Sequence, residues 1–308
     1  MTRTSKKTEH GKLLTEQRNP VSGDIDNRSI EEILHIINAE DQKVAGIVAG
    51  EIPTITKATE FVVDAFDNGG RLIYVGAGTS GRLGVLDASE IPPTYNASLE
   101  LVQGFIAGGD KALRTAIEGA EDFPEDGAKL VREIHVTDKD VVMGIATSGV
   151  TPYVLGALEE AGRIGAKTVF LTCVTPDDIA IEVDALIAPQ VGAEVITGST
   201  RMKAGTATKM VLNMITTTAM IKQGKVFENL MVDLKATNYK LIDRARRIIA
   251  TITNISYEEA SELLARADNF VKVALVMQKA GVDPQQAQKY LERYGGNVRR
   301  AIAEMEKK

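Results

Sequence analysis

The chain has 308 residues, of which 44% are hydrophobic and 25% charged, and its formal net charge is −6. This length suits one large α/β domain with a smaller addition, and the negative charge argues against nonspecific binding to DNA or RNA. The single cysteine, Cys173, excludes a disulfide framework, and no apolar run approaches the length of a membrane span. We therefore expect a cytoplasmic protein with no nucleic-acid or membrane partner.

The start of the chain predicts an arm followed by helices. Residues 1–28 are mostly polar and include Asn19-Pro20, which is typical of a loop. The sequence Ser29-Ile-Glu-Glu32 has the spacing of a capping box, so a helix should begin there. A further helical region is expected from residue 44 to residue 67, where Gly69-Gly70 ends it.

A short apolar strand at residues 72–75 leads into the glycine-rich stretch Gly76-Ala-Gly-Thr-Ser-Gly-Arg82. The glycines let backbone amides approach a ligand, while Thr79 and Ser80 add hydroxyls and Arg82 adds a cation. A helix that begins near Arg82 would direct its free amides and its dipole at the same loop, which favours a phosphate. The candidate phosphate ligands here are Thr79, Ser80, Gly81 and Arg82. The loop fits neither standard nucleotide motif, because it lacks a Walker lysine and a convincing acidic strand end about 20 residues later.

Three of the glutamates that follow this loop are candidates for acid-base chemistry or controls for it. Glu90 lies about two helical turns farther on, close enough to be near a bound anion without being neutralised by it. A strand is expected at residues 101–106, and then a helix over residues 110–121 in which Glu118 and Glu121 share a face. Taken alone, glutamates on such a helix are usually solvated.

The plan of strand, Ser/Thr/Gly loop and helix then occurs a second time. A strand at residues 141–145 precedes Thr147-Ser-Gly149, with Thr151 as the expected cap of a helix that has Pro152 in its first turn. Two such loops on one parallel sheet can converge on one ligand at the carboxyl ends of the strands. Further candidate phosphate ligands are therefore Thr147, Ser148, Gly149 and Thr151.

The remaining elements predict a parallel sheet with helices on both faces, because strands expected at residues 167–173 and 184–188 continue the alternation. Gly198 then opens a long helix that runs to about residue 222. Its polar, cationic entrance consists of Ser199, Thr200, Arg201 and Lys203. A small all-helical subdomain is expected at residues 250–308, which leaves residues 29–249 as the main domain and residues 1–28 as the arm.

These stretches resemble the sugar isomerase (SIS) phosphosugar-binding domain and, more narrowly, the N-acetylmuramic acid 6-phosphate etherase family. The resemblance covers nearly the whole chain, and it makes the helical tail similar to the UBA-like end of the family. The stretches that carry it are Thr15-Glu-Gln-Arg-Asn-Pro20, Gly76-Ala-Gly-Thr-Ser-Gly-Arg-Leu-Gly84, Asp87-Ala-Ser-Glu90, Glu118-Gly-Ala-Glu-Asp122, Gly198-Ser-Thr-Arg-Met-Lys-Ala-Gly-Thr206 and Asn229-Leu-Met-Val-Asp233.

The resemblance implies a phosphosugar substrate, a homodimer and a reaction that needs no redox cofactor or metal ion. In this family, D-lactate leaves C3 of N-acetylmuramic acid 6-phosphate to give N-acetylglucosamine 6-phosphate. One carboxyl group takes the acidic C2 proton of the open-chain sugar, another protonates the departing oxygen, and water then adds with the roles reversed. The resemblance points to Glu121 for the C2 proton and Glu90 for the leaving lactate, and it leaves Glu118 dispensable.

Two other functions stay open. An aldose-ketose isomerase of phosphosugars also needs a base beside its substrate, so the first loop does not distinguish it from an etherase. A phosphosugar-sensing regulator without catalytic activity would keep the phosphate loops and would not need both carboxylates. The Glu-Gly-Ala-Glu-Asp stretch and the Ser-Thr-Arg-Met-Lys helix start favour the etherase.

Overall fold

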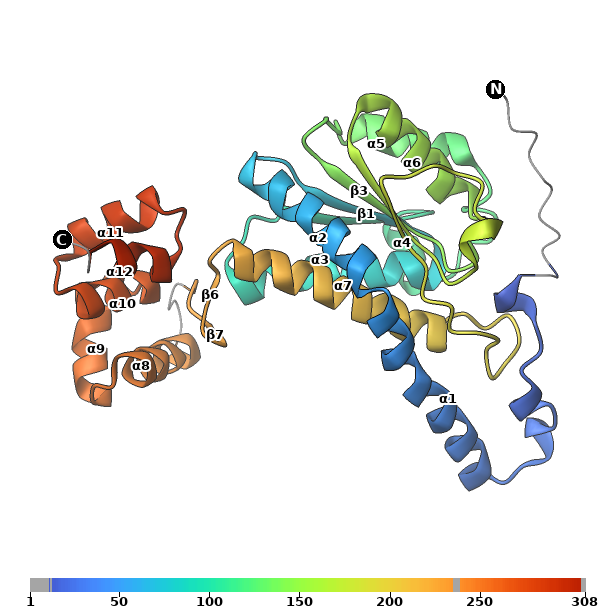
Figure 1. Ribbon diagram of the computed structural model, residues 1–308, viewed down its shortest axis with the longest axis horizontal. Coiled ribbons are helices and arrows are strands. Elements are labelled where there is room, and N and C mark those ends of the chain that lie inside the picture. The colour runs from blue at the N-terminus through green and yellow to red at the C-terminus, as the bar shows by residue number, and fades with distance from the viewer. Residues whose placement is uncertain (1–10, 12, 235–238, 306–308) are drawn as a thin grey trace. The chain divides into compact units, whose positions relative to one another are not determined.

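The computed structural model describes residues 11, 13–234 and 239–305 (Figure 1). The chain divides into two compact units, one made of residues up to 89 together with 99–216 and the other of residues 90–98 together with those from 217 onward. The first unit contains a parallel sheet, and the second consists of helices and one short hairpin.

From residue 13 onward, the first unit begins with three short 3-10 turns and two helices. The turns are η2 (Leu14–Glu16), η3 (Pro20–Ser22) and η4 (Ile25–Asn27). The next element, α1 (Ile30–Gly50), begins with the predicted capping box, in which the Ser29 hydroxyl accepts a hydrogen bond from the Glu32 amide. It is followed by α2 (Ile52–Asp67), which has Pro53 in its first turn. The predicted start of the first helix is thereby confirmed.

Five parallel strands form the centre of this unit, in the order β2-β1-β3-β4-β5. β1 and β3 are buried throughout, as expected for continuous apolar runs in a parallel sheet. Their register pairs Gly76 with Ile145, so the loops that follow these two strands leave the same edge of the sheet next to each other. The strands are β1 (Leu72–Gly76), β2 (Val102–Ile106), β3 (Val141–Ile145), β4 (Lys167–Leu171) and β5 (Ala185–Ile187).

Helices cover both faces of the sheet (Figure 1). On one face, α6 (Pro152–Ile164) packs against Ile73, Val142 and Phe170, and α5 (Pro124–Glu133) packs against α6. On the other face, α2 contacts the sheet and Gly84 of α3 (Gly78–Tyr95) packs directly on Tyr74. The remaining helices are α4 (Asp110–Arg114), η5 (Pro176–Asp178) and α7 (Lys203–Lys222). This arrangement is the predicted SIS-type sheet.

The second unit has an apolar core of its own, in which residues 273–277 of α10 are all buried. Its elements are β6 (Val226–Phe227), β7 (Leu230–Met231), α8 (Tyr239–Thr253), α9 (Tyr257–Arg266), α10 (Val271–Ala280), α11 (Pro284–Arg293) and α12 (Val298–Met305). The predicted helices of the tail are confirmed, whereas the hairpin was not predicted because its strands are too short to show a pattern. The expected boundary between residues 249 and 250 falls within α8 and stays a prediction. No helix in the described ranges is both long and apolar enough to cross a membrane.

Cys173 follows β4 and is buried. Its amide donates a hydrogen bond of 3.0 Å to the carbonyl oxygen of Thr147, which ties this segment to the loop after β3. Burial raises the pKa of the Cys173 thiol to about 12, so the thiolate is scarce at neutral pH. The residue therefore acts as a small structural side chain.

Candidate active site

The first predicted phosphate loop is shorter than the sequence suggested, because α3 begins at Gly78 and not near Arg82. Thr79, Ser80 and Gly81 consequently lie in the first turn of a helix, where backbone amides lack acceptors within the helix. The amide of Gly81 is the exception, since it donates to the carbonyl oxygen of Ala77 at 3.1 Å. A Cβ atom on Gly81 would lie 2.6 Å from Ile106, so the glycine is also required for packing against β2.

The second loop, from Thr147 to Thr151, leaves β3 beside the first. Gly149 has a φ of +76°, and a side chain there would also collide with Val174 and Ile179. Thr151 occupies the N-cap of α6, as predicted, but its side chain makes no capping hydrogen bond. The two loops thus bring the N-termini of α3 and α6 to one edge of the sheet, an arrangement suited to an anion such as phosphate.

The third predicted stretch, residues 198–203, lies next to the first loop. Gly205 of α7 lies close to Thr79: a Cβ atom added to Gly205 would be 3.7 Å from the Cγ2 atom of Thr79. Ser199 and Thr200 are partly exposed and Arg201 is exposed in the turn before α7. Lys203 differs, because its side chain is only 3% exposed and its ammonium is 2.6 Å from Glu40. Its predicted contact with phosphate stays a prediction.

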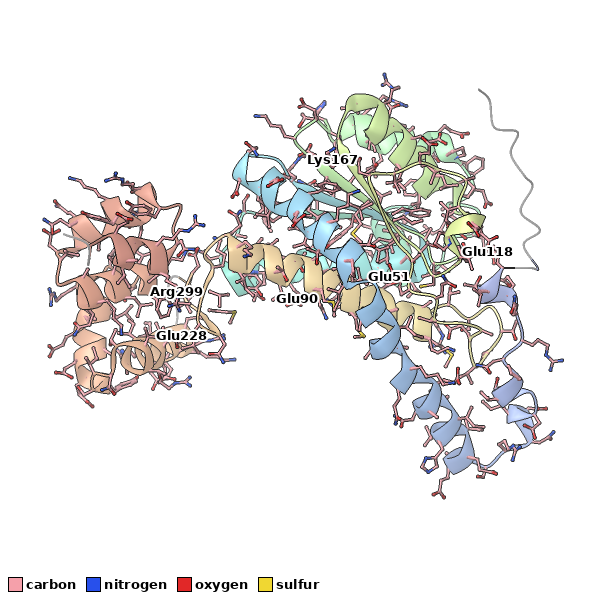
Figure 2. All side chains as sticks on the ribbon, viewed as in Figure 1. Glu51, Glu90, Glu118, Lys167, Glu228 and Arg299 are labelled. Atoms are coloured by element: carbon pink, nitrogen blue, oxygen red, sulfur yellow. The ribbon has the colours of Figure 1, made fainter. Side chains whose placement is uncertain are left out.

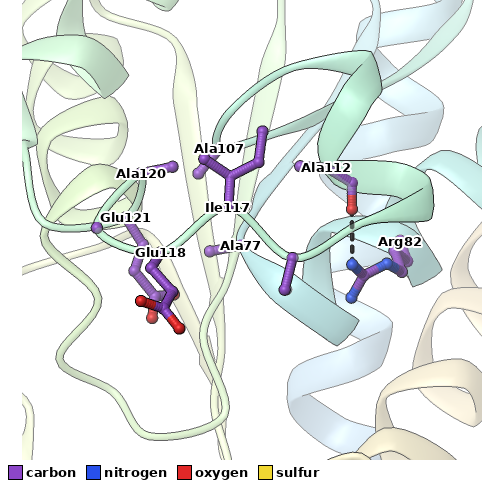
Figure 3. A pocket seen from close by; sticks show the side chains of 11 residues that line it. Ala77, Arg82, Ala107, Ala112, Ile117, Glu118, Ala120 and Glu121 are labelled. Carbon is purple, nitrogen blue, oxygen red and sulfur yellow. Dashed lines mark hydrogen bonds between the residues drawn. The ribbon is translucent and has the colours of Figure 1, made fainter.

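A cleft of about 220 Å³ opens beside the first loop (Figure 3). It lies between the start of α3, the end of β2, α4 and the segment that follows α4. Both Glu118 and Glu121 line it, so the carboxylate predicted to be dispensable is at the same cleft as the one predicted to be catalytic. The lining residues are Ala77, Gly78, Arg82, Ala107, Ala112, Ala116, Ile117, Glu118, Gly119, Ala120 and Glu121.

Arg82 holds the wall of this cleft through backbone carbonyl groups. Its Nε donates to the carbonyl oxygen of Leu113 at 3.0 Å. Its Nη2 donates to that of Ala112 at 2.6 Å, the contact drawn as a dashed line in Figure 3. These two carbonyl groups are at the C-terminal end of α4, where helical carbonyls need partners and a cation is favoured. The guanidinium, predicted as a phosphate ligand, is therefore largely occupied in fixing α4.

The helix predicted over residues 110–121 is wrong in its second half. α4 ends at Arg114, and the following residues form extended backbone and a turn in which Gly119 has a φ of +73°. Glu118 and Glu121 therefore lie on a loop and do not share a helical face (Figure 3). The carbonyl oxygen of Glu121 accepts a hydrogen bond of 3.0 Å from the amide of Tyr153, in the first turn of α6. This contact fastens the Glu121 loop to the second phosphate loop.

Glu90 is exposed on α3, on the part of this helix that belongs to the second unit (Figure 2). Three residues earlier, Asp87 is buried and accepts hydrogen bonds from the Tyr74 hydroxyl at 3.1 Å and the Lys209 ammonium at 3.0 Å. Burial, followed by the charge of Asp87, raises the pKa of Tyr74 well above its ordinary value, so the phenol stays protonated. The pairing of Glu90 with Glu121 stays a prediction, because the two carboxyl groups belong to different units.

Comparisons with known proteins agree with this arrangement. A family model described as the glucokinase regulatory protein N-terminal SIS domain matches residues 54–161, which contain both phosphate loops and the cleft. A second model, described as the C-terminal lid domain of glucokinase regulatory protein, matches residues 228–272.

Curated relatives match almost the whole chain. The N-acetylmuramic acid 6-phosphate etherase of Salinibacter ruber is 53% identical over 291 residues, which are 94% of this chain and 94% of the relative. The chain belongs to the N-acetylmuramic acid 6-phosphate etherase family. Proteins of the same name from Clostridium beijerinckii and Lactobacillus acidophilus are 51% and 50% identical, over 96% and 94% of this chain and 97% of each relative.

Sequence reasoning toward this etherase family missed the buried polar groups that support the site. Asp87 and Asn19 were inside stretches that carry the resemblance, yet nothing in those stretches indicated that their side chains are buried. Glu40 and Glu194 gave no signal at all, because each lies in a sequence where a glutamate is usually exposed. The partner of Glu40 is 163 residues away, and Glu194 binds backbone amides nine and ten residues later, so only the folded structure identifies these contacts.

Proposed function

We propose that this protein cleaves the D-lactyl ether of N-acetylmuramic acid 6-phosphate and releases N-acetylglucosamine 6-phosphate and D-lactate. It would act as a carbon-oxygen lyase in the cytoplasm, in the recycling of cell-wall amino sugars. One observation carries the proposal: the amide of Tyr153 binds the carbonyl oxygen of Glu121. This contact sets a loop that bears carboxylates against the start of α6, at a cleft that the start of α3 also lines.

The phosphate of the substrate would bind where α3 and α6 begin. The donors would be amides in the first turn of α3, the hydroxyls of Thr79, Ser80, Thr147 and Ser148, and the loop backbone that Gly149 allows to come close. The first amides of α6 are already bonded to the carbonyl oxygens of Glu121 and Thr151, so this helix contributes its dipole and the hydroxyls of the loop before it. Ser199, Thr200 and Arg201 would complete the substrate site from the side of Thr79. The exposed guanidinium of Arg201 suits a substrate with two anionic groups, a phosphate and a lactyl carboxylate.

The chemistry would proceed by elimination and re-addition on the open-chain sugar. Glu121 takes the proton from C2, the C3–O bond of the ether breaks, and Glu90 gives its proton to the lactate oxygen as a double bond forms between C2 and C3. Water then adds at C3 as it loses a proton to Glu90, and Glu121 returns a proton to C2. The net change is the addition of one water molecule across the ether bond.

The first test measures D-lactate release from N-acetylmuramic acid 6-phosphate by the wild type and by three isosteric variants. We expect Glu90→Gln and Glu121→Gln to lose at least about a hundred-fold in rate, as is usual when a general acid or base is removed. Glu118→Gln should retain activity and is the matched control, because its carboxylate lines the same cleft. A Glu118→Gln enzyme as inactive as Glu121→Gln would show that the assignment is wrong.

The order of the two roles has its own measurement. In deuterated solvent, Glu90→Gln should still exchange the C2 proton of the substrate, because Glu121 remains to remove it. A Glu121→Gln variant that exchanges this proton would reverse the assignment.

The alternatives predict different results from the same protein. An isomerase would interconvert an aldose and a ketose phosphate and release no lactate. A phosphosugar-sensing regulator needs a binding measurement of its own, because both matched family models are described by the name of a regulatory protein. For such a regulator, phosphosugar would raise the melting temperature of wild type and of both glutamate variants alike, without turnover.

We further propose that the protein is a homodimer, as the resemblance implies. Light scattering at the working concentration should give twice the chain mass of 33.1 kDa. A monomer under the conditions of full activity would contradict this part of the proposal.

A further inference from the structure

The segment of residues 13–22 runs along the loop of residues 193–198 and binds its backbone at three points. The amide of Gly198 donates to the carbonyl oxygen of Thr15 at 3.2 Å, the Ser22 hydroxyl donates to that of Val195 at 2.7 Å, and the Asn19 side chain donates to that of Ala193 at 2.9 Å. Thr15, Asn19 and Ser22 are all buried. The segment therefore supports a loop that leads directly into the predicted substrate-binding stretch.

A buried ion pair joins the same segment to α1 and α7. The ammonium of Lys203 lies 2.6 Å from Oε2 of Glu40, and the Asn19 side chain donates to that same oxygen at 2.9 Å. Lys43 binds the other oxygen of Glu40 from the surface. Glu40 is 4% exposed and Lys203 is 2% exposed, so both charges are satisfied by protein groups and not by solvent.

The N-terminus of α7 is closed to a ligand by a protein carboxylate. Glu194, which is fully buried, accepts hydrogen bonds from the amides of Lys203 at 3.0 Å and Ala204 at 2.9 Å. Burial raises the pKa of Glu194 despite these hydrogen bonds. Because the first amides of α7 are already taken, this helix does not offer an anion the free backbone donors that the start of α3 offers.

The geometry points to a bracing role: residues 13–22 hold the 198–203 stretch in place for substrate, and Lys203 is a positioning residue that acts through Glu40 instead of touching phosphate. This inference rests on the proposed function only in taking residues 198–203 as part of the substrate site. The contact between Gly205 and Thr79 explains how the brace acts, since a loosened start of α7 would also disturb the first phosphate loop.

The structural half of the inference is tested by hydrogen exchange on the full chain without substrate. Asn19→Ala and Ser22→Ala each remove one hydrogen bond to the 193–198 loop, from Asn19 to the carbonyl oxygen of Ala193 and from Ser22 to that of Val195. Backbone amides of residues 193–204 should therefore exchange about five-fold faster in each variant. Arg18→Ala is the matched control, because Arg18 is exposed in the same segment and makes no described side-chain contact. Equal exchange in Asn19→Ala, Ser22→Ala and the control would overturn the brace whether or not the protein is an etherase.

The functional half is tested by lactate release and by binding of N-acetylglucosamine 6-phosphate. Asn19→Ala should raise the KM for substrate and the Kd for this product by about five-fold, with kcat at saturation changed by less than about two-fold. Lys203→Met should do the same, and the double variant should be no worse than the poorer single variant, because both residues act through Glu40.

A direct phosphate contact would give a different pattern. Lys203→Met would then weaken binding while Asn19→Ala would not, and their effects would add in the double variant. If Lys203→Met does not fold, Asn19→Ala and Ser22→Ala still decide the question, because neither removes a charged group and both leave the pair of Glu40 and Lys203 in place. If the wild type releases no lactate, product binding and hydrogen exchange still test the brace while the etherase proposal alone fails.

Discussion

Replacing Gly156 with alanine should force α5 away from α6. The two helices meet backbone to backbone: a Cβ atom on Gly156 would lie 2.0 Å from the carbonyl oxygen of Pro124, and one on Gly127 would lie 1.9 Å from that of Tyr153. Ordinary contacts of a Cβ atom begin at 3.4 Å, so relief requires a movement of about 1.4 Å. A backbone carbonyl cannot rotate aside as a flexible side chain can.

The expected magnitude follows from two opposed effects. Overpacking of a well-packed contact costs up to about 3 kcal/mol, and the better helix propensity of alanine offsets about 1 kcal/mol of that. The free energy of unfolding should fall by about 2 kcal/mol, which corresponds to a melting temperature lower by about 4–8 °C for a unit of this size. Lactate release should also fall, because Pro124 closely follows Glu121 and Tyr153 holds the Glu121 carbonyl.

Thermal unfolding followed by circular dichroism, together with the lactate assay, measures both effects. Gly162→Ala is the control on the same helix, because a Cβ atom there would meet only Thr168, at 3.8 Å. It should leave the melting temperature unchanged or raise it. A Gly156→Ala protein as stable and as active as Gly162→Ala would refute the argument from close packing.

Three further outcomes follow from buried and paired groups. Burial raises the pKa of Glu40, but hydrogen bonds from Lys203, Lys43 and Asn19 outweigh it and lower the pKa from 4.5 to about 2. The ionised carboxylate thus contributes about 3 kcal/mol to the free energy of unfolding at neutral pH. In urea unfolding, the stability advantage of wild type over Glu40→Gln should shrink as the pH falls from about 4.5 towards 2, and a difference that does not change with pH would contradict this. Arg82→Met should lower kcat by about ten-fold through the loss of its two carbonyl contacts. Arg82→Lys should not restore kcat, because an ammonium lacks the planar fork of a guanidinium. Full rescue by lysine would instead favour a role in which Arg82 contacts the phosphate as a point charge. Lys209→Met should lower the free energy of unfolding in urea by about 2 kcal/mol, because it leaves Asp87 buried with Tyr74 as its remaining partner. A loss below about 0.5 kcal/mol, which is the range of ordinary surface substitutions, would exclude a stabilising role for the pair of Lys209 and Asp87.

The sequence was most informative where structure is local. The apolar runs at Leu72 and Val141, each followed by glycine and hydroxyl residues, predicted two buried parallel strands and two helix starts on one edge of the sheet. These signals are strong because a strand buried on both faces and a turn with a positive φ each restrict the residues that fit. The helices of the tail were equally predictable from caps and apolar spacing.

The end of α4 was not predictable, because its cause lies elsewhere in the chain. Leu113, Ala116, Ile117 and Ala120 have helical spacing, yet the guanidinium of Arg82 binds the carbonyl groups of Ala112 and Leu113 and the helix stops at Arg114. A local pattern contains neither that contact nor the positive φ of Gly119. The predicted helix would have placed Glu118 and Glu121 on one face, whereas the loop allows the backbone of Glu121 to reach α6.

The part of the site formed by distant partners was likewise invisible in the sequence. From the sequence, Lys203 is a cation at the N-terminus of a helix, and a lysine there is a reasonable phosphate ligand by residue type. Its partner Glu40 is 163 residues away, and the two become a buried pair only when α1 and α7 meet. Residue type therefore predicted the chemistry available to the stretch, while folding decides which groups remain free to use it.

The burial of Cys173 has a practical consequence for labelling. The chain has one thiol, and both its burial and its raised pKa protect it from reagents that need an accessible thiolate. A cysteine introduced at an exposed position would then be the main reactive site, with no need to remove the native one. Placing one at Leu99 and one at Lys289 gives each compact unit a dye, and energy transfer between the dyes can report how their separation responds to phosphosugar.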